Sequence, residues 1–349
     1  LPTLREYGSC VYMSAEAAAA AVLLSEELLG VIADFIGLDF FSGCALAFGA
    51  AGSVARHKRV SWRLCRLESS FGSHGPGDGQ FCAPSSIVAT ASGVAVSDAG
   101  NCRVQSLTPS GSHLLSMPLC PGPHVVAGLA AAADGTIFAG IKEFDSGWDY
   151  PSLDRWHSYV LRASPTGDIL ERFGGACGGG SNQFSRVCGV SLAGSQLLVV
   201  DQGNHRIVVL GTAPKLRWLR AFGSQGSGRG ELSLPETAIG HEGSVYVADQ
   251  GNARVSVWTE EGRYVRCFGA PGGGAGMFEE VCGLAILGTP ARLVACDVSR
   301  LHVMTLHGVP LHVIHFGAAA DVCGVTVAHG QLFVTDQRQS IVHVLHLWL

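Results

Sequence analysis

The sequence predicts an all-β protein: a six-bladed β-propeller whose last blade is closed by an N-terminal strand, preceded by a small helical segment. A short motif recurs at VSDAGNCRVQSL, VVDQGNHRIVVL and VADQGNARVSVW, centred on Asp98, Asp201 and Asp249, with weaker copies at Asp297 and Asp336. The steps from Asp201 to Asp249 and from Asp249 to Asp297 are both 48 residues. A fixed period of this length is typical of repeat architectures.

A second landmark is a Phe-Gly pair, which precedes each copy of the motif. The pairs stand at 71–72, 173–174, 222–223, 268–269 and 316–317. In four of the five copies, a small residue after the Phe-Gly pair lies twelve positions before the Asp, as Ser86 does before Asp98. The copy that starts at Gly283 runs two residues longer. The same offset applied to Gly128 leads to Gly140. We therefore expect a degenerate second unit in which Gly140 replaces the Asp, which gives six units in all.

Each unit contains four strand-like runs. In LLVVDQGNHRIVVL, two β-rich runs flank DQGN, whose composition is typical of a turn. The Asp can cap that turn through its own side chain, so a structural role is expected for the recurring Asp. Arg103, Arg206 and Arg254 follow the turns at a fixed offset and are predicted to brace them.

The two ends of the repeat region complement each other. The last unit stops after its third strand, IVHVLHLWL (341–349), and a spare strand, VSWRLCRLESSFG (60–72), precedes the first unit. Pairing the two leaves no open edge in the ring. The sequence therefore predicts a propeller domain over residues 59–349.

These units resemble the NHL repeat. The resemblance rests on FGSHGPGDGQFCAPSSIVATASGVAVSDAGNCRVQSLTPSG (71–111) and GELSLPETAIGHEGSVYVADQGNARVSVWTEEG (230–262), and it covers about residues 60–349. Three units depart from the pattern at the turn, where Gly140 replaces Asp and Arg300 and Gln339 replace Asn. NHL propellers often occur in ubiquitin-ligase chains, and the resemblance also brings RNA binding and a zinc-dependent lyase into consideration.

Residues 1–58 differ in composition and form a predicted helical segment. SAEAAAAAVLLSEELLGVIADFI (14–36) is rich in helix formers, and a second helix is expected over 40–55. Apolar residues recur at helical spacing in the first helix. They include Leu24, Leu28, Ile32 and Phe35.

This segment resembles an F-box, which docks the adaptor subunit of cullin-type ubiquitin ligases. The resemblance implies that Leu24, Leu28, Ile32 and Phe35 contact such an adaptor. Ser25 stands where the family usually has Pro, and residues 49–52 stand where a basic, Trp-containing stretch would be expected. The alternative is an amphipathic helix pair that packs on the propeller as a cap.

Candidate binding residues lie where the repeats differ from one another. Arg186, Glu236, Glu280 and Asp321 flank the predicted starts of the inner strands and would form a mixed-charge recognition rim on the loop face. The alternative is that these are ordinary solvated loop charges. Cys188, Cys282 and Cys323 recur at one repeat position and are predicted to be either buried small residues or a metal or redox site.

The second unit carries an insertion over residues 142–157, KEFDSGWDYPSLDRWH. Its aromatic residues Trp148, Tyr150 and Trp156 are candidates for partner contact, because aromatic side chains often anchor interfaces. The alternative is a lid that folds on its own aromatic residues.

Composition argues against several classes of function. The formal net charge is −5, only three Lys occur, and no block of like charge appears, so nucleic acid and membrane surfaces are unexpected partners. The twelve Cys include no CxxC pair and no secretory signal is recognised, so we expect a cytoplasmic protein with reduced thiols. No predicted inner strand contains a zinc-binding His pattern; His241 and His329 fall at strand exits.

We therefore expect no catalytic residues, metal or cofactor. The prediction is a non-enzymatic protein-recognition module, most concretely the substrate-recognition component of a ubiquitin ligase. Its target would bind the loop face of the propeller, and an adaptor would bind the N-terminus. The alternative is a general interaction scaffold, and an RNA-binding propeller or a zinc-dependent lyase ranks below both.

Overall fold

The computed structural model describes residues 6–7, 10–11, 65–119, 124–143 and 157–347. The chain separates into two units, Leu1–Trp62 and Arg63–Leu349. In the first unit, β1 (Glu6–Tyr7) and β2 (Cys10–Val11) pair in antiparallel fashion. The helices expected over 14–36 and 40–55 lie outside the described residues.

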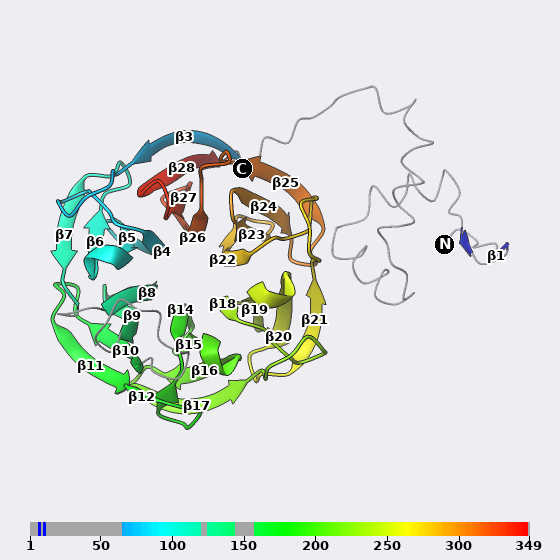
Figure 1. Ribbon diagram of the computed structural model, residues 1–349, viewed down its shortest axis with the longest axis horizontal. Helices are drawn as coiled ribbons and strands as arrows, with labels where there is room; N and C mark the ends of the chain where they lie inside the picture. Colours follow the sequence, from blue (N-terminus) through cyan, green and yellow to red (C-terminus); the bar gives the residue numbers. More distant parts are fainter. Residues whose placement is uncertain (1–5, 8–9, 12–64, 120–123, 144–156, 348–349) are drawn as a thin grey trace. The chain divides into compact units, whose positions relative to one another are not determined.

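The second unit is a six-bladed β-propeller made of four-stranded antiparallel sheets (Figure 1). Blade A consists of β4 (Pro84–Thr90), β5 (Gly93–Asp98), β6 (Arg103–Leu107) and β7 (His113–Met117). Blade B consists of β8 (His124–Ala131), β9 (Ile137–Glu143), β10 (His157–Ala163) and β11 (Ile169–Gly174). Blade C consists of β14 (Val187–Ala193), β15 (Gln196–Asp201), β16 (Arg206–Gly211) and β17 (Arg217–Phe222).

Blades D to F repeat this order around the ring. Blade D consists of β18 (Pro235–His241), β19 (Ser244–Asp249), β20 (Arg254–Thr259) and β21 (Tyr264–Phe268). Blade E consists of β22 (Val281–Leu287), β23 (Arg292–Asp297), β24 (Arg300–Thr305) and β25 (Pro310–His315). Blade F consists of β26 (Val322–Ala328), β27 (Gln331–Asp336), β28 (Ile341–Leu347) and β3 (Cys65–Phe71). The loop before β14 also contains a short parallel pair, β12 (Ala176–Cys177) with β13 (Gln183–Phe184).

The predicted closure of the ring is confirmed. β3, from the start of the propeller, pairs with β28, from its end, with Val342 opposite Phe71 and Val344 opposite Ser69. Val342 is fully buried and packs with Phe81 of blade A in a common apolar cluster. The closing strand is the outermost strand of blade F, so it joins the two ends of the propeller within one sheet.

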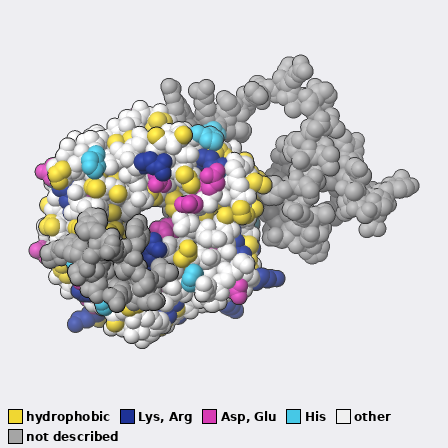
Figure 2. Space-filling model, viewed as in Figure 1, with side chains coloured by type: hydrophobic (Ala, Val, Ile, Leu, Met, Phe, Trp, Pro, Cys, Tyr) yellow, Lys and Arg dark blue, Asp and Glu magenta, His cyan; other side chains and the backbone are white. Residues whose placement is uncertain are grey.

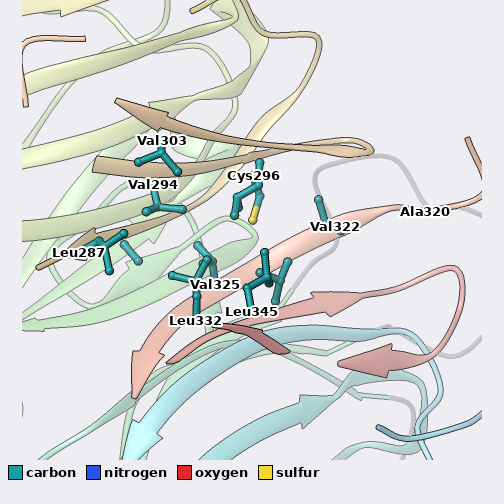
Figure 3. Packing of buried hydrophobic residues seen from close by; sticks show 12 residues of the cluster. Leu287, Val294, Cys296, Val303, Ala320, Val322, Val325, Leu332 and Leu345 are labelled. Carbon is teal, nitrogen blue, oxygen red and sulfur yellow. The ribbon is translucent and has the colours of Figure 1, made fainter. Parts of the chain in front are cut away.

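The hydrophobic core is divided among the interfaces between blades. The strands alternate in face, so each middle strand sends apolar side chains to both neighbouring blades. Figure 3 shows the cluster between blades E and F, where Val294 and Cys296 face Val325 and Leu332. All four are 7% exposed or less, and burying one such side chain contributes about 1.5–3 kcal/mol.

The recurring Asp is structural, as predicted, but its bonds differ from the expected cap. In blade D, the fully buried Asp249 accepts hydrogen bonds from the N–H of Ser233 (2.7 Å), from Asn252 Nδ2 (2.9 Å) and from Arg254 Nε (2.7 Å). Its side chain makes no cap to the following short 3₁₀ turn. Arg254 continues to the carbonyl oxygens of the glycine-rich loop, including that of Gly228 (3.1 Å).

Equivalent networks occur in blades A and C, so in blades A, C and D the Asp and Arg tie the loop that enters the blade to its second strand. Asp98 accepts from the N–H of Cys82 (2.6 Å) and from Arg103 Nε (2.8 Å). Asp201 accepts from Arg206 Nε at 2.7 Å. The prediction that these Arg residues brace the turns is confirmed by these contacts.

The position of the missing Asp in blade B requires a correction. Val126 pairs with Ile141, as Pro84 pairs with Asp98 in blade A. Ile141, rather than the predicted Gly140, therefore occupies the Asp position, and it is fully buried. The hairpin between β8 and β9 is longer by one residue than its equivalent in blade A, which shifts the offset that the sequence suggested.

Within the described ranges, no helix has the length and apolar character needed to cross a membrane.

Candidate functional site

Two recesses lie along the propeller axis. The inner strands line a channel of about 340 Å³, and a second recess of about 300 Å³ opens beside it; we call the second one the mouth recess. The two share Glu236, Cys282, Cys323 and Gln337 among their lining residues. Since each of these residues stands at or near a strand end that carries the Asp network, the mouth recess belongs to the loop face.

The structure brings the four predicted rim residues into the same recess. Arg186, Glu236, Glu280 and Asp321 all line the mouth recess, although they belong to four different blades. Arg186, Glu236 and Asp321 are half-buried and Glu280 is exposed. Their convergence follows from the repeat. Each residue lies at the start of an inner strand, and the inner strands together line the central channel.

The buried Asp residues hold the backbone that carries this rim. The N–H of Glu280 donates to Asp297 (2.7 Å), and the N–H of Asp321 donates to Asp336 (3.2 Å). Arg186 has a φ of 60°, a left-handed conformation that non-glycine residues rarely adopt. The buried Asp carboxylates therefore fix the backbone of the rim, while the rim side chains differ from blade to blade.

Three glutamines that the sequence reasoning overlooked also line the mouth recess. Gln202, Gln250 and Gln337 each come directly after the Asp of their blade. Gln202 Nε2 donates to the Glu236 carboxylate across the boundary between blades C and D, and Gln337 Nε2 contacts Cys323 Sγ (2.8 Å). The Asp-Gln pairs of the repeated motif could have indicated these residues. In each pair, the Gln that follows the buried Asp lines the mouth recess.

Lys142 occupies the same position in blade B, directly after Ile141. Its ammonium group lies close to the Cys188 thiol and counteracts, in part, the effect of burial on that thiol's pKa. The positive side chains Lys142 and Arg186 thus belong to blades B and C, whereas the carboxylates belong to blades D, E and F. In Figure 2, acidic and basic side chains border the central opening.

The channel thiols are held in neutral form. Burial raises the pKa of Cys188 and Cys323 to about 12, and it raises the pKa of Cys282 well above its ordinary value. Negative charge nearby adds to this effect, and Glu236 contributes for all three thiols, which places its carboxylate near the axis. Cys282 Sγ donates to the carbonyl oxygen of Val322 in the next blade (3.2 Å). The Cys282 thiol thus forms a small polar contact between the inner strands of blades E and F.

Two histidines on the third strands of blades E and F contact the buried Asp of their blade. His302 Nε2 lies 3.4 Å from Asp297 Oδ2, and His343 Nε2 lies 3.3 Å from Asp336 Oδ2. His241 ends β18, at the opposite end of that strand from the mouth recess. Among the described residues, no group of three His, Cys, Asp or Glu has the arrangement of a metal site.

The remaining predicted contact residues are not placed. Trp148, Tyr150 and Trp156 of the insertion, and Leu24, Leu28, Ile32 and Phe35 of the N-terminal segment, lie outside the described residues.

Comparison with known proteins supports the fold more strongly than any activity. No protein-family model matches the chain. A stretch of 77 residues is 36% identical to RING finger protein nhl-1 of Caenorhabditis elegans; it makes up 22% of this chain and 8% of that protein. The matched part is thus a small fraction of the relative's length, and the activity of the whole relative is not transferred to this chain by the match.

Solved propeller structures resemble this one at low sequence identity. A streptogramin B lyase has a TM-score of 0.54 and 14% identity over 82% of this chain and 99% of its own. A protein of unknown function from Bacteroides thetaiotaomicron has a TM-score of 0.59 and 14% identity over 81% of this chain and 76% of its own. The WD40 β-propeller domain of Doa1 has a TM-score of 0.50 and 11% identity over 80% of this chain and 96% of its own. At these identities the likeness establishes the propeller fold alone.

Proposed function

We propose that this protein is a non-catalytic recognition module that binds a protein target at the mouth recess. The observation that carries the proposal is the convergence of side chains that differ from blade to blade, from four blades, on one recess. Loops on a rigid scaffold are a usual location for binding residues. The recess also contains Leu234, an exposed apolar side chain among charged neighbours, which suits a protein partner.

The rim favours protein over nucleic acid. Three carboxylates and one guanidinium line the mouth recess. Binding of a nucleic acid depends on cations that neutralise phosphates, and three carboxylates at the centre of the face oppose it.

A more specific form of the proposal is a substrate-recognition component of a ubiquitin ligase, built from NHL-type repeats. Two observations support it: the 77-residue similarity to a RING finger protein, and the F-box-like order of Leu24, Leu28, Ile32 and Phe35. In this form the N-terminal segment binds a cullin adaptor. Copurification of the adaptor with the full chain, and its loss in a Leu28→Asp variant, would support this form. Without copurification, the general interaction scaffold is the better description.

Site-specific photo-crosslinking tests the binding face directly. A photoreactive amino acid replaces Leu234, which precedes β18 at the mouth recess, or Glu242, which follows the other end of the same strand. Glu242 is 82% exposed and serves as the matched control. We expect a discrete protein adduct from position 234 and no such adduct from position 242. An identical adduct pattern from both positions, or none from position 234, would contradict the proposal.

A further inference from the structure

Glycine-rich loops of the same backbone geometry enter blades A, C, D and E. We call them the entry loops, and they cover residues 72–81, 175–184, 223–232 and 269–278. In each of them a main-chain N–H donates to the carbonyl oxygen three residues earlier at 3.1–3.3 Å, and the donors are Gln80, Gln183, Glu231 and Met277. These four residues therefore occupy one repeat position.

In blades A, C and D, the side chain at this position closes the same turn a second time. A side-chain oxygen of Gln80, Gln183 or Glu231 accepts from the N–H of the glycine three residues earlier, at 2.7–3.0 Å. Blade E has Met277 here, and a thioether sulfur is only a weak acceptor. The entry loop of blade E therefore lacks the strong acceptor that its counterparts have.

The sulfur of Met277 lies where Gln80 has its side-chain carbonyl carbon. A Cβ on Gly274 would lie 3.2 Å from Met277 Sδ, and a Cβ on the equivalent Gly77 would lie 3.4 Å from Gln80 Cδ and 2.9 Å from Gln80 Oε1. A Cβ on Gly272 would lie 2.9 Å from the same sulfur, and the equivalent distance to Gln80 Cδ is 2.7 Å. An oxygen added to the sulfur would therefore take the place of Gln80 Oε1.

We propose that Met277 is a site of reversible oxidation and that its sulfoxide completes the closing hydrogen bond of the blade E entry loop. Methionine sulfoxide carries an oxygen and a methyl group on Sδ, as glutamine carries an oxygen and a nitrogen on Cδ, so the two side chains branch alike. The sulfoxide oxygen accepts from the N–H of Gly274. Oxidation makes the sulfur chiral, and one of the two epimers directs its oxygen at this N–H.

The oxidant is a hydroperoxide. The thioether sulfur attacks the terminal oxygen, the O–O bond breaks, and the proton of that oxygen moves to the departing alkoxide. The products are the sulfoxide and an alcohol, or water when the oxidant is hydrogen peroxide. The sulfur loses two electrons and the peroxide gains two, and methionine sulfoxide reductases restore the thioether.

Exposure makes Met277 the accessible sulfur among the described methionines. Its exposed fraction is 43%, whereas Met117 is 2% exposed and Met304 is fully buried. A peroxide in solution can therefore reach Met277 without any opening of the propeller.

The oxidised position lies just before the rim. Glu279 and Glu280 follow Met277 closely, and the N–H groups of both donate to the buried Asp297 at 2.8 and 2.7 Å. Glu280 lines the mouth recess. A second closing bond in the entry loop thus holds the segment that leads to the rim more firmly, whichever target the recess binds.

Peroxide titration of the full chain, followed by peptide mass spectrometry, measures the selectivity. We expect the peptide that contains Met277 to gain one oxygen at least about 10-fold faster than those that contain Met117 or Met304, because the oxidant must reach the sulfur. Equal rates for the three peptides in the folded protein would overturn the inference.

Hydrogen exchange at Gly274 measures the new hydrogen bond. We expect oxidation, and Met277→Gln without oxidation, each to slow exchange of this amide about 5-fold, as for one net hydrogen bond. The reductase specific for the matching epimer should restore the faster exchange. Met277→Leu keeps the apolar volume and has no sulfur to oxidise, so peroxide should leave its Gly274 exchange unchanged, and any effect of oxidising the exposed Cys267 would show in this matched control.

The direction of the change decides the outcome. Oxidation that only disrupts a loop speeds exchange, so faster or unchanged exchange at Gly274 in the oxidised protein would contradict the proposal. A Met277→Gln variant that exchanges as fast as the unmodified chain would contradict it as well, because glutamine closes the equivalent loops of blades A and C.

Discussion

Replacement of Asp249 by Ala tests the idea that each buried Asp holds the loop face in place. The side chain is fully buried and accepts from the N–H of Ser233, from Asn252 and from Arg254, at 2.7 to 2.9 Å. Removing it leaves the Arg254 guanidinium, whose side chain is 13% exposed, without its carboxylate. Breaking a buried charge pair in this way costs about 3–5 kcal/mol, so we expect the free energy of unfolding to fall by about 4 kcal/mol.

The assay is urea and thermal unfolding of the full chain. One kcal/mol lowers the melting temperature of a large domain by about 2–4 °C, so Asp249→Ala should lower it by about 8 °C or more. Glu242→Ala, at an 82% exposed side chain of the same blade, should change the free energy of unfolding by less than about 0.5 kcal/mol.

A double-mutant cycle isolates the pair. Asp249→Ala combined with Arg254→Ala should destabilise the protein by less than the sum of the single changes, because either change alone already breaks the Asp249–Arg254 ion pair. We expect a coupling of about 1–3 kcal/mol. Additive losses, or a loss below about 1 kcal/mol for Asp249→Ala, would refute the view that this ion pair and its hydrogen bonds stabilise the loop face.

Three further results are expected. Deletion of residues 65–71 removes the strand that pairs with β28, and circular dichroism should show a large drop in melting temperature; an unchanged melting temperature would contradict the closure. Burial opposes ionisation of Asp336, but hydrogen bonds from His343 and backbone N–H groups outweigh it and lower the pKa of the carboxyl. This contribution to stability is therefore present above the ordinary carboxyl pKa of about 3.9 and is lost as the pH falls towards the folded value. Between about pH 5 and 2.5, the urea midpoint of the unmodified protein should decline more steeply than that of Asp336→Asn. Parallel curves would contradict the stabilising role of the ionised Asp336. Ellman's reagent should label the exposed Cys267 rapidly in the native protein, whereas Cys188, buried and with its pKa raised to about 12, should be labelled only after unfolding; equal rates would show that the channel thiol is accessible.

Much of the fold was predictable because the repeat is encoded locally. Each unit carries its own turn residues, so the spacing from Ser86 to Asp98 marks the first two strands of a blade without knowledge of the rest. The spare strand before the first unit was enough to predict closure, since an unpaired edge in a ring is unfavourable. The starts of the inner strands, and with them Arg186, Glu236, Glu280 and Asp321, followed from the same alignment.

The offset failed where a hairpin changed length. A count of residues cannot distinguish Gly140 from Ile141 at the Asp position, because one additional residue in the β8–β9 hairpin moves the register and leaves the composition almost unchanged. Only the pairing of Val126 with Ile141 decides it.

By itself, the sequence determined the number of blades, their order and the strand that closes the ring, because these depend on contacts within a unit or between its two ends. Only the tertiary structure decided which side chains of different blades contact one another near the propeller axis. Gln202 and Glu236 are 34 residues apart and belong to different blades, yet their side chains share a hydrogen bond in the mouth recess. Such contacts depend on how neighbouring blades turn about the axis, and no local pattern of residues encodes that angle.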